Sequence, residues 1–304
     1  YNRKKFNSRT RPGRMNRNGS EIMKNTWKIQ IWGVRGSFPA PAEEFLLYGG
    51  NTVCVSVSCD ANLIVFDAGS GLAALGNALE NALEKGENYP RIDIFLSHLH
   101  LDHLMGFFTF RPFYRPDMEI HIYGQDHELD RHLCRLLAPP YWPIGLKDFQ
   151  AKVFIHPLCP KKTVRLSGQE HRKEGEGIIL HTLPGNHPGK SLLYRMEGAG
   201  KSLVYGLDCE IDAGFAPAYI DFARNADLLF WDAAFTEKDK KAGWGHSTWE
   251  QGIAFRQQAN INQVLMLHYS SDYTDSFLAR QEELAKQRDP ASCFAKEGMT
   301  ILLP

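Results

Sequence analysis

The sequence LSHLHLDHLMG, residues 96–106, decides the fold of this chain. It begins at the end of a largely apolar run, residues 92–96, which predicts a buried strand, and it places His98, His100, Asp102 and His103 within six positions. Because the chain turns after the strand, His98 and His100 can reach one metal ion, and Asp102 and His103 can reach a second. Imidazole with carboxylate is a ligand set of zinc, iron or manganese rather than of calcium or magnesium. The alternative is a histidine-rich surface turn without a ligand, and the dense spacing argues against it.

The composition predicts a globular protein with a sizeable core. Of 304 residues, 43 % are hydrophobic and 23 % are charged. We expect no membrane partner, because no apolar stretch has the length of a membrane span and no signal-peptide pattern opens the chain. The six cysteines form no C-x-x-C pair, so we expect reduced thiols in a cytoplasmic protein.

The charges are unevenly distributed. Residues 1–26 carry eight basic residues and one acid, which predicts a basic, flexible N-terminal tail, with a nucleic-acid-binding arm or a targeting segment as alternatives. The remaining 27 basic and 34 acidic residues give residues 27–304 a net charge of −7, and we expect this part to form a single domain. An acidic body argues against nucleic acid as the main partner and leaves room for a small phosphate ester at a metal.

Several apolar runs end at a polar residue that could serve a site. These strand-ending residues are Asp67, His98, Asp208, Asp232 and His268. Near-continuous apolar runs predict strands buried on both faces, and the second half of the chain repeats the strand pattern of the first. One such aspartate alone would be interpreted as a turn or a helix cap. Five together favour one cleft at the carboxyl ends of the strands.

These residues resemble the metallo-β-lactamase superfamily. The resemblance rests on H-x-H-x-D-H at residues 98–103, a lone downstream histidine, an aspartate ending one strand and a histidine ending another. It implies an α/β fold, a four-layer αββα sandwich of two mixed β-sheets with a dinuclear metal site at the sheet edge. The motifs RGSFP, YGGNT, DAGSGL, HPGKSLLYR and GWGHST narrow it to the branch of tRNA 3′-end endonucleases and cyclic phosphodiesterases, including phosphoribosyl cyclic phosphate phosphodiesterases.

The resemblance implies a set of seven metal ligands. It assigns one ion to His98, His100 and His187, a second to Asp102, His103 and His268, and a bridging position to Asp208. We expect Asp208 rather than Cys209 to face the metals, because neighbouring strand residues point to opposite faces. The cofactors are then two divalent ions, with zinc the default and manganese or iron the alternatives.

Further residues receive roles around these ligands. His246 is expected to face the site and stabilise phosphate charge or protonate the leaving oxygen, with a structural helix-start histidine as the alternative. Asp67 and Asp232 are expected to orient ligand histidines or His246. Asn51, Ser191, Tyr194 and Arg195 are expected to shape the substrate cleft, with purely structural roles as the alternative.

The resulting hypothesis is a metal-dependent phosphodiesterase that acts on a small or cyclic phosphodiester by attack of a metal-bridged hydroxide, with Asp102, Asp208 and His246 as its catalytic residues. A tRNA 3′-processing endonuclease is an alternative, disfavoured because no glycine-rich basic arm is present, so RNA is a disfavoured partner. A thioesterase or lactonase, and a noncatalytic metal-containing sensor or binding module, are further hypotheses. The sequence leaves a homodimer open.

Overall fold

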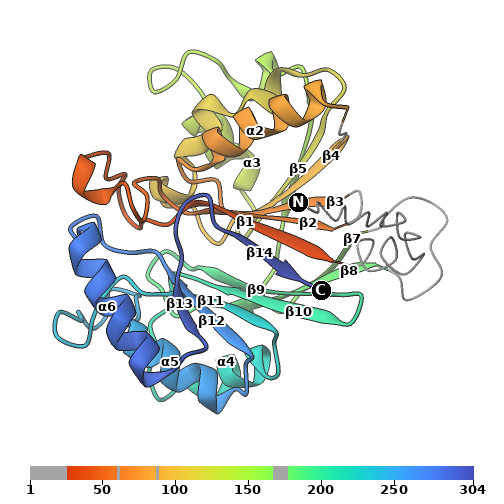
Figure 1. Cartoon of the computed structure of the whole chain (residues 1–304). Helices are drawn as coiled ribbons and strands as arrows, with labels where there is room; N and C mark the ends of the chain where they lie inside the picture. The colour runs from red at the N-terminus through yellow and green to blue at the C-terminus, as the bar shows by residue number, and fades with distance from the viewer. Residues whose placement is uncertain (1–25, 60–61, 87–88, 167–176) are drawn as a thin grey trace, which may run out of the picture.

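The computed structural model describes residues 26–59, 62–86, 89–166 and 177–304. Two seven-stranded sheets face one another, and helices cover the outer side of each, so the molecule has four layers (Figure 1). The predicted αββα sandwich of two mixed sheets is confirmed. The predicted N-terminal tail, apart from Thr26, lies outside the described residues.

The first sheet comes from the N-terminal half and the last strand. Its order is β14-β1-β2-β3-β4-β5-β6. The strands are β1 (Trp27–Gly33), β2 (Cys54–Cys59), β3 (Asn62–Phe66), β4 (Arg91–Phe95), β5 (Glu119–Gly124), β6 (Lys152–Pro157) and β14 (Thr300–Leu303). Strands β3 to β6 run parallel, and β14, β1 and β2 complete the sheet with antiparallel pairs.

The second sheet repeats this plan, as the sequence predicts. Its order is β13-β12-β11-β10-β9-β8-β7. The strands are β7 (Thr163–Leu166), β8 (Ile178–Pro184), β9 (Leu192–Gly198), β10 (Lys201–Gly206), β11 (Leu228–Asp232), β12 (Gln263–Leu267) and β13 (Ser292–Phe294). Strands β10 to β13 run parallel, while β7 to β10 pair antiparallel.

Helices pack on the outer faces of both sheets (Figure 1). The α-helices are α2 (Leu72–Glu84), α3 (Leu129–Leu136), α4 (Ala216–Ala223), α5 (Trp249–Gln258) and α6 (Asp275–Arg288). The short 3-10 helices are η1 (Glu43–Phe45), η2 (Leu101–His103), η3 (Met105–Thr109), η4 (Arg111–Tyr114) and η5 (Leu146–Asp148). Helix α2 buries Leu72, Leu75 and Leu79, whose spacing forms one apolar stripe.

Aromatic side chains join the two sheets beneath the loops that form the site. Phe66 of β3 stacks on Tyr205 of β10 with 5.0 Å between ring centroids, and Phe95 of β4 meets Tyr194 of β9 at 5.5 Å. All four side chains are fully buried. Their packing places the carboxyl ends of β3 and β4 opposite β9 and β10.

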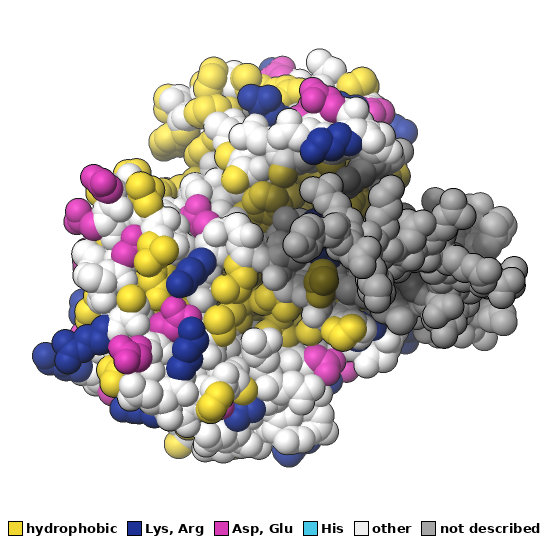
Figure 2. Space-filling model, in the orientation of Figure 1, with side chains coloured by type: hydrophobic (Ala, Val, Ile, Leu, Met, Phe, Trp, Pro, Cys, Tyr) yellow, Lys and Arg dark blue, Asp and Glu magenta, His cyan; other side chains and the backbone are white. Residues whose placement is uncertain are grey.

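The surface drawn in Figure 2 carries Lys and Arg interspersed with Asp and Glu, and hydrophobic side chains gather toward the middle of this face. In the ranges that the structure describes, no helix is both long and apolar enough to span a membrane.

Candidate metal centre

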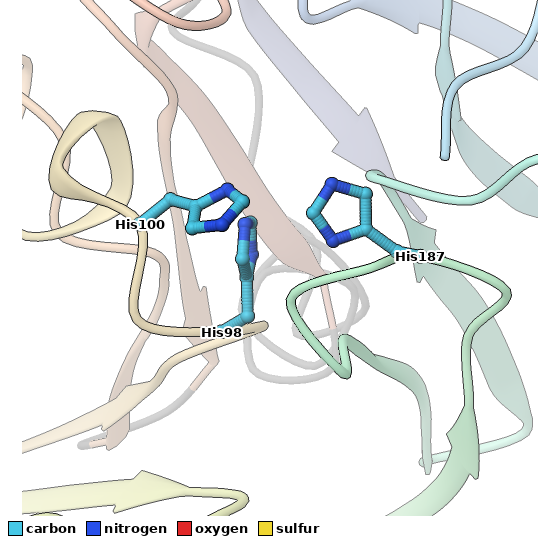
Figure 3. Close-up of side chains that lie close together, drawn as sticks. All are labelled: His98, His100 and His187. Carbon is cyan, nitrogen blue, oxygen red and sulfur yellow. The ribbon is translucent and has the colours of Figure 1, made fainter. Parts of the chain in front are cut away.

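Three histidines form the first cluster, and they come from two loops (Figure 3). His98 and His100 lie in the loop after β4, and His187 lies in the loop after β8. The ring centroid of His98 is 4.3 Å from that of His100 and 4.7 Å from that of His187. One nitrogen from each ring lies within 4.8 Å of the other two. The backbone N–H of Gly189 donates to Nδ1 of His187 at 3.0 Å, which leaves Nε2 as the ligand atom.

A second cluster lies beside the first and consists of Asp102, His103 and His268. Oδ2 of Asp102 is 3.2 Å from Nε2 of His103 and 3.4 Å from Nε2 of His268. All three residues are buried. Asp102 and His103 lie on η2, whereas His268 directly follows β12, so the second cluster also joins the two halves of the chain.

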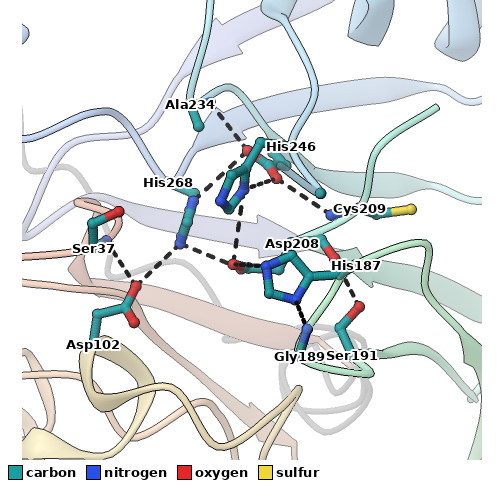
Figure 4. Close-up of polar contacts among 12 residues, drawn as sticks. Ser37, Asp102, His187, Gly189, Ser191, Asp208, Cys209, Ala234, His246 and His268 are labelled. Atoms are coloured by element: carbon teal, nitrogen blue, oxygen red, sulfur yellow. Dashed lines mark hydrogen bonds and ion pairs between the residues drawn. The ribbon is translucent and has the colours of Figure 1, made fainter. Parts of the chain in front are cut away.

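Asp208 lies between the two clusters, and Figure 4 shows it beside His187 of the first and His268 of the second. Its Oδ1 is 3.8 Å from Nε2 of both His98 and His187. Its Oδ2 is 3.3 Å from Nε2 of both His103 and His268. The two oxygens of one carboxylate are thus divided between the clusters, which is the placement expected of a bridging ligand.

Unsatisfied buried atoms show that these residues fit metal ions. Within the described ranges, Nε2 of His98, His103 and His268 and Oδ2 of Asp208 are buried without a hydrogen-bond partner. Each such group costs about 1–3 kcal/mol if nothing satisfies it. Because these atoms face one another, divalent ions would satisfy all of them, and the nitrogen and oxygen donors suit zinc, manganese or iron.

The electrostatics of the two clusters differ. Burial lowers the pKa of His98, and it lowers the pKa of His187 to about 4, so these imidazoles stay neutral and able to ligate. Burial alone would also lower the pKa of His268, but the carboxylates of Asp208 and Asp102 raise it to about 10. The second cluster therefore has a negative field that favours a cation.

Three residues of the site adopt a left-handed backbone conformation that is uncommon outside glycine. The φ angles are 58° for Asp67, 51° for Asp208 and 63° for His268. Each residue stands within two positions of the end of a strand. The turn redirects the chain at the strand end, and such strained positions concentrate at functional sites.

Asp67 and Asp232 hold histidines from behind. Oδ2 of Asp67 is 2.8 Å from Nδ1 of His103, and Oδ2 of Asp232 is 2.8 Å from Nδ1 of His246. A carboxylate can only accept, so Nδ1 of each ring donates and Nε2 stays free for the site. Both aspartates are fully buried.

His246 lies at the edge of both clusters. Its ring centroid is 5.3 Å from that of His187 and 5.1 Å from that of His268, and its Nδ1 is 3.8 Å from Oδ1 of Asp208. Burial alone would lower the pKa of His246, but Asp232 offsets this effect and raises it, which favours the protonated ring. The side chain is 14 % exposed, so the ring remains reachable from outside.

Two residues expected at the substrate cleft lie elsewhere. The Tyr194 side chain is fully buried between the sheets, where its hydroxyl donates to the Leu96 carbonyl at 2.6 Å. Arg195 points the opposite way on β9 and donates to Glu197 and to two carbonyls at the end of α4. This follows from the alternation of side chains along a strand.

The other two residues expected at the cleft support the site through hydrogen bonds. Oγ of Ser191 donates to the Asp208 carbonyl at 2.7 Å and so fixes the backbone of the central carboxylate. Asn51 donates from Nδ2 to Glu297 at 2.9 Å and accepts from Ser70. The structure supports the structural alternative for both residues.

The loop after β1 contributes contacts that the sequence did not reveal. The N–H of Ser37 donates to Oδ2 of Asp102 at 2.7 Å. A Cβ on Gly36 would lie 2.4 Å from Cε1 of His268, so only glycine lets this loop pass the imidazole. Arg35 is fully buried and anchors the loop by donating to the carbonyls of Gly49 and Tyr273. The RGSFP motif marked this loop in the sequence, but it did not indicate that the loop contacts Asp102 and His268.

The αββα fold and the paired histidine and aspartate clusters define a metallohydrolase of the metallo-β-lactamase fold. Residues 62–269 match the family model described as "Beta-lactamase superfamily domain". The chain belongs to this family.

Among curated proteins, the chain is similar to two archaeal proteins named Ribonuclease Z. The one from Ignicoccus hospitalis is 27 % identical over 79 % of this chain and 90 % of its own length. The one from Archaeoglobus fulgidus is 23 % identical over 86 % of this chain and 92 % of its own length. Each match thus extends over most of both proteins.

Solved structures share the fold. The metallo-β-lactamase fold protein YhfI from Bacillus subtilis superposes with a TM-score of 0.64 at 19 % identity, covering 92 % of this chain and 100 % of its own. The short form of human tRNase Z gives 0.62 at 19 % identity over 91 % and 99 %. A diphosphatase of the PhnP family gives 0.63 at 19 % identity over 91 % and 97 %.

Proposed function

We propose that this protein hydrolyses a phosphodiester bond, with a small or cyclic phosphodiester as its substrate. The observation that carries the proposal is the position of Asp208, whose two carboxylate oxygens face two separate clusters of ligands. Two divalent ions in such a site would lower the pKa of water and stabilise both the attacking and the leaving oxygen of an in-line displacement at phosphorus.

The side chains of the site divide the work. The pKa of Asp102 lies far below its usual value because His103 and His268 more than offset the effect of burial, so this carboxylate stays ionised as a ligand. His246 is held by Asp232 with Nε2 free, and its raised pKa favours the protonated form. A protonated imidazole beside the clusters can stabilise phosphate charge or give a proton to the leaving oxygen.

Charge supports a small substrate. Residues 27–304 carry 27 basic and 34 acidic side chains, and acids are interspersed with bases on the face drawn in Figure 2. A polyanion gains affinity from clustered Lys and Arg, whereas a small phosphodiester needs only the metal centre. The second candidate is cleavage of precursor tRNA, which the names of the archaeal relatives favour.

A panel of substrates tests the proposal. Protein reconstituted with zinc or manganese would be assayed on bis-p-nitrophenyl phosphate, cyclic nucleotides, cyclic phosphoribose and precursor tRNA. We expect turnover of the small phosphodiesters. Asp208→Ala should abolish this turnover, whereas Asp221→Ala, a matched change on the exposed side of α4, should not alter it.

Three other outcomes of this panel would each favour a different function. Cleavage of precursor tRNA alone would establish the second candidate. Activity on a thioester or a lactone, with none on any phosphodiester, would move the protein to that class of metallohydrolase. A metal-loaded protein inert on the whole panel would favour a noncatalytic sensor.

A further inference from the structure

The segment just before His246 contains two glycines, which have no side chain to restrain it. Gly243 and Gly245 flank Trp244 and have φ angles of 78° and 83°. Glycine adopts positive and negative φ angles about equally well, so its own conformation does not hold the backbone at these values. The loop nevertheless packs closely on the first cluster, since a Cβ on Gly245 would lie 2.2 Å from Cδ2 of His187. A residue outside this segment must therefore fix its backbone.

One carboxylate binds both glycines. Oε2 of Glu210 accepts from the N–H of Gly243 at 2.8 Å and from the N–H of Gly245 at 3.1 Å. Hydrogen bonds to an ionised acceptor are about twice as strong as bonds between neutral groups. Glu210 therefore replaces the restraint that the two glycines lack.

Glu210 is itself fixed relative to the metal ligands. It stands two residues after Asp208, and its N–H donates to the Asn186 carbonyl at 2.9 Å. The Asn186 side chain returns a hydrogen bond to the Glu210 carbonyl at 3.0 Å. Asn186 directly precedes His187, so Glu210 connects the backbone of two ligands with the backbone that carries His246.

We propose that Glu210 is the positioning residue for His246. The proposal rests on the proposed phosphodiesterase function. Asp232 fixes the His246 ring through Nδ1, but a single bond to the ring lets the backbone beneath it shift. Glu210 holds that backbone, and Ser247 adds a bond from Oγ to the Cys209 carbonyl at 2.6 Å. Together these contacts keep the His246 ring beside the clusters, 5.3 Å from that of His187 and 5.1 Å from that of His268.

Kinetics on two aryl phosphodiesters test this role. One substrate would release p-nitrophenol and the other phenol, a poorer leaving group that depends more on protonation. For Glu210→Ala we expect kcat on the phenyl ester to fall by up to about a hundredfold, the loss that a misplacement of about 1 Å can cause. The loss on the p-nitrophenyl ester should be smaller, with KM and metal content as in the wild type.

Further variants separate positioning from a general structural role. Glu210→Gln keeps an acceptor oxygen and should recover most of the lost turnover. Adding Glu210→Ala to His246→Ala should cause no further loss, because both changes remove the same contribution. Glu283→Ala, on the exposed side of α6, is the matched control.

Amide hydrogen exchange gives a readout that needs no activity. Residues 243–246 should exchange faster in Glu210→Ala than in the wild type, and residues 98–103 should not change. Unchanged exchange, or an equal loss on both esters that persists in the His246→Ala background, would overturn the assignment of Glu210. An inactive wild type with faster loop exchange in Glu210→Ala would overturn the proposed function and, with it, the catalytic purpose of the restraint.

Discussion

Replacing Asp67 by asparagine should lower the metal affinity of one site more than that of the other. Asp67 is fully buried, and its two oxygens have different partners. Oδ1 accepts from the Ser97 N–H at 2.6 Å. Oδ2 accepts from Nδ1 of His103 at 2.8 Å, from Tyr205 at 2.9 Å and from the Ser97 hydroxyl at 2.8 Å. The amide has the same shape but only one oxygen, so it can serve only one of these two groups of donors.

Two separate costs follow. If the amide oxygen keeps the His103 side, its NH2 faces the Ser97 N–H, and one buried donor is left unsatisfied at about 1–3 kcal/mol. The His103 ring then donates to a neutral oxygen, which lowers the basicity of Nε2. Loss of such an orienting carboxylate weakens metal binding by about 10- to 100-fold. The ion held by Asp102, His103 and His268 should be affected most, because Asp67 reaches the first cluster only through the Ser97 hydroxyl, which lies 3.1 Å from Nδ1 of His98.

Metal stoichiometry against free zinc concentration measures this effect. The wild type should bind two ions, and Asp67→Asn should bind the second about 10- to 100-fold more weakly, with a smaller change at the first. Asp93→Asn is the matched control, because Asp93 is an equally buried carboxylate that accepts from Arg91 and Tyr123 away from the clusters. Equal weakening of both ions, or unchanged binding of both, would refute the orienting role of Asp67.

Two further predictions concern the second cluster and the ions together. Gly36→Ala should reduce metal content toward one ion per chain and destabilise the fold by about 1–3 kcal/mol, because its Cβ would lie 2.4 Å from the His268 ring. Metal analysis and denaturant unfolding measure the two effects. Gly177→Ala is the control, because a Cβ there would make only an ordinary contact. Chelation should lower the thermal midpoint, because an ion at a hundred times its Kd adds about 2.7 kcal/mol to stability; a midpoint that excess zinc fails to restore would contradict a reversible metal site.

Short sequence patterns indicated which strand ends carry the polar residues of the site. The H-x-H-x-D-H spacing and the polar residues at strand ends are visible within short windows, because a strand end brings its next residues to one edge of a sheet. The strand-end pattern placed Asp208 and His268 in one cleft with His98, but their roles as metal ligands, and His187 altogether, came from the resemblance to a family. Spacing alone could not assign a shared metal site to residues that lie 89 to 170 positions after His98.

Contacts made across the fold were beyond the sequence. Ser37 meets Asp102 through its backbone N–H, a group that every residue type except proline carries, so its sequence position has no chemical signature. Tyr194 and Arg195 were expected to shape the substrate cleft, because a guanidinium can pair with phosphate. On β9 one points between the sheets and the other toward α4, and neither direction leads to the metal centre.

The left-handed backbone at Asp67, Asp208 and His268 sets the stability of the fold against the side chains of the site. At each of these positions glycine would relieve strain, so a search for greater stability alone would remove the very side chains that gather the ions. The fold thus tolerates a local loss of stability at three strand ends. A stabilised version of this protein that keeps its chemistry should therefore leave these three turns unchanged.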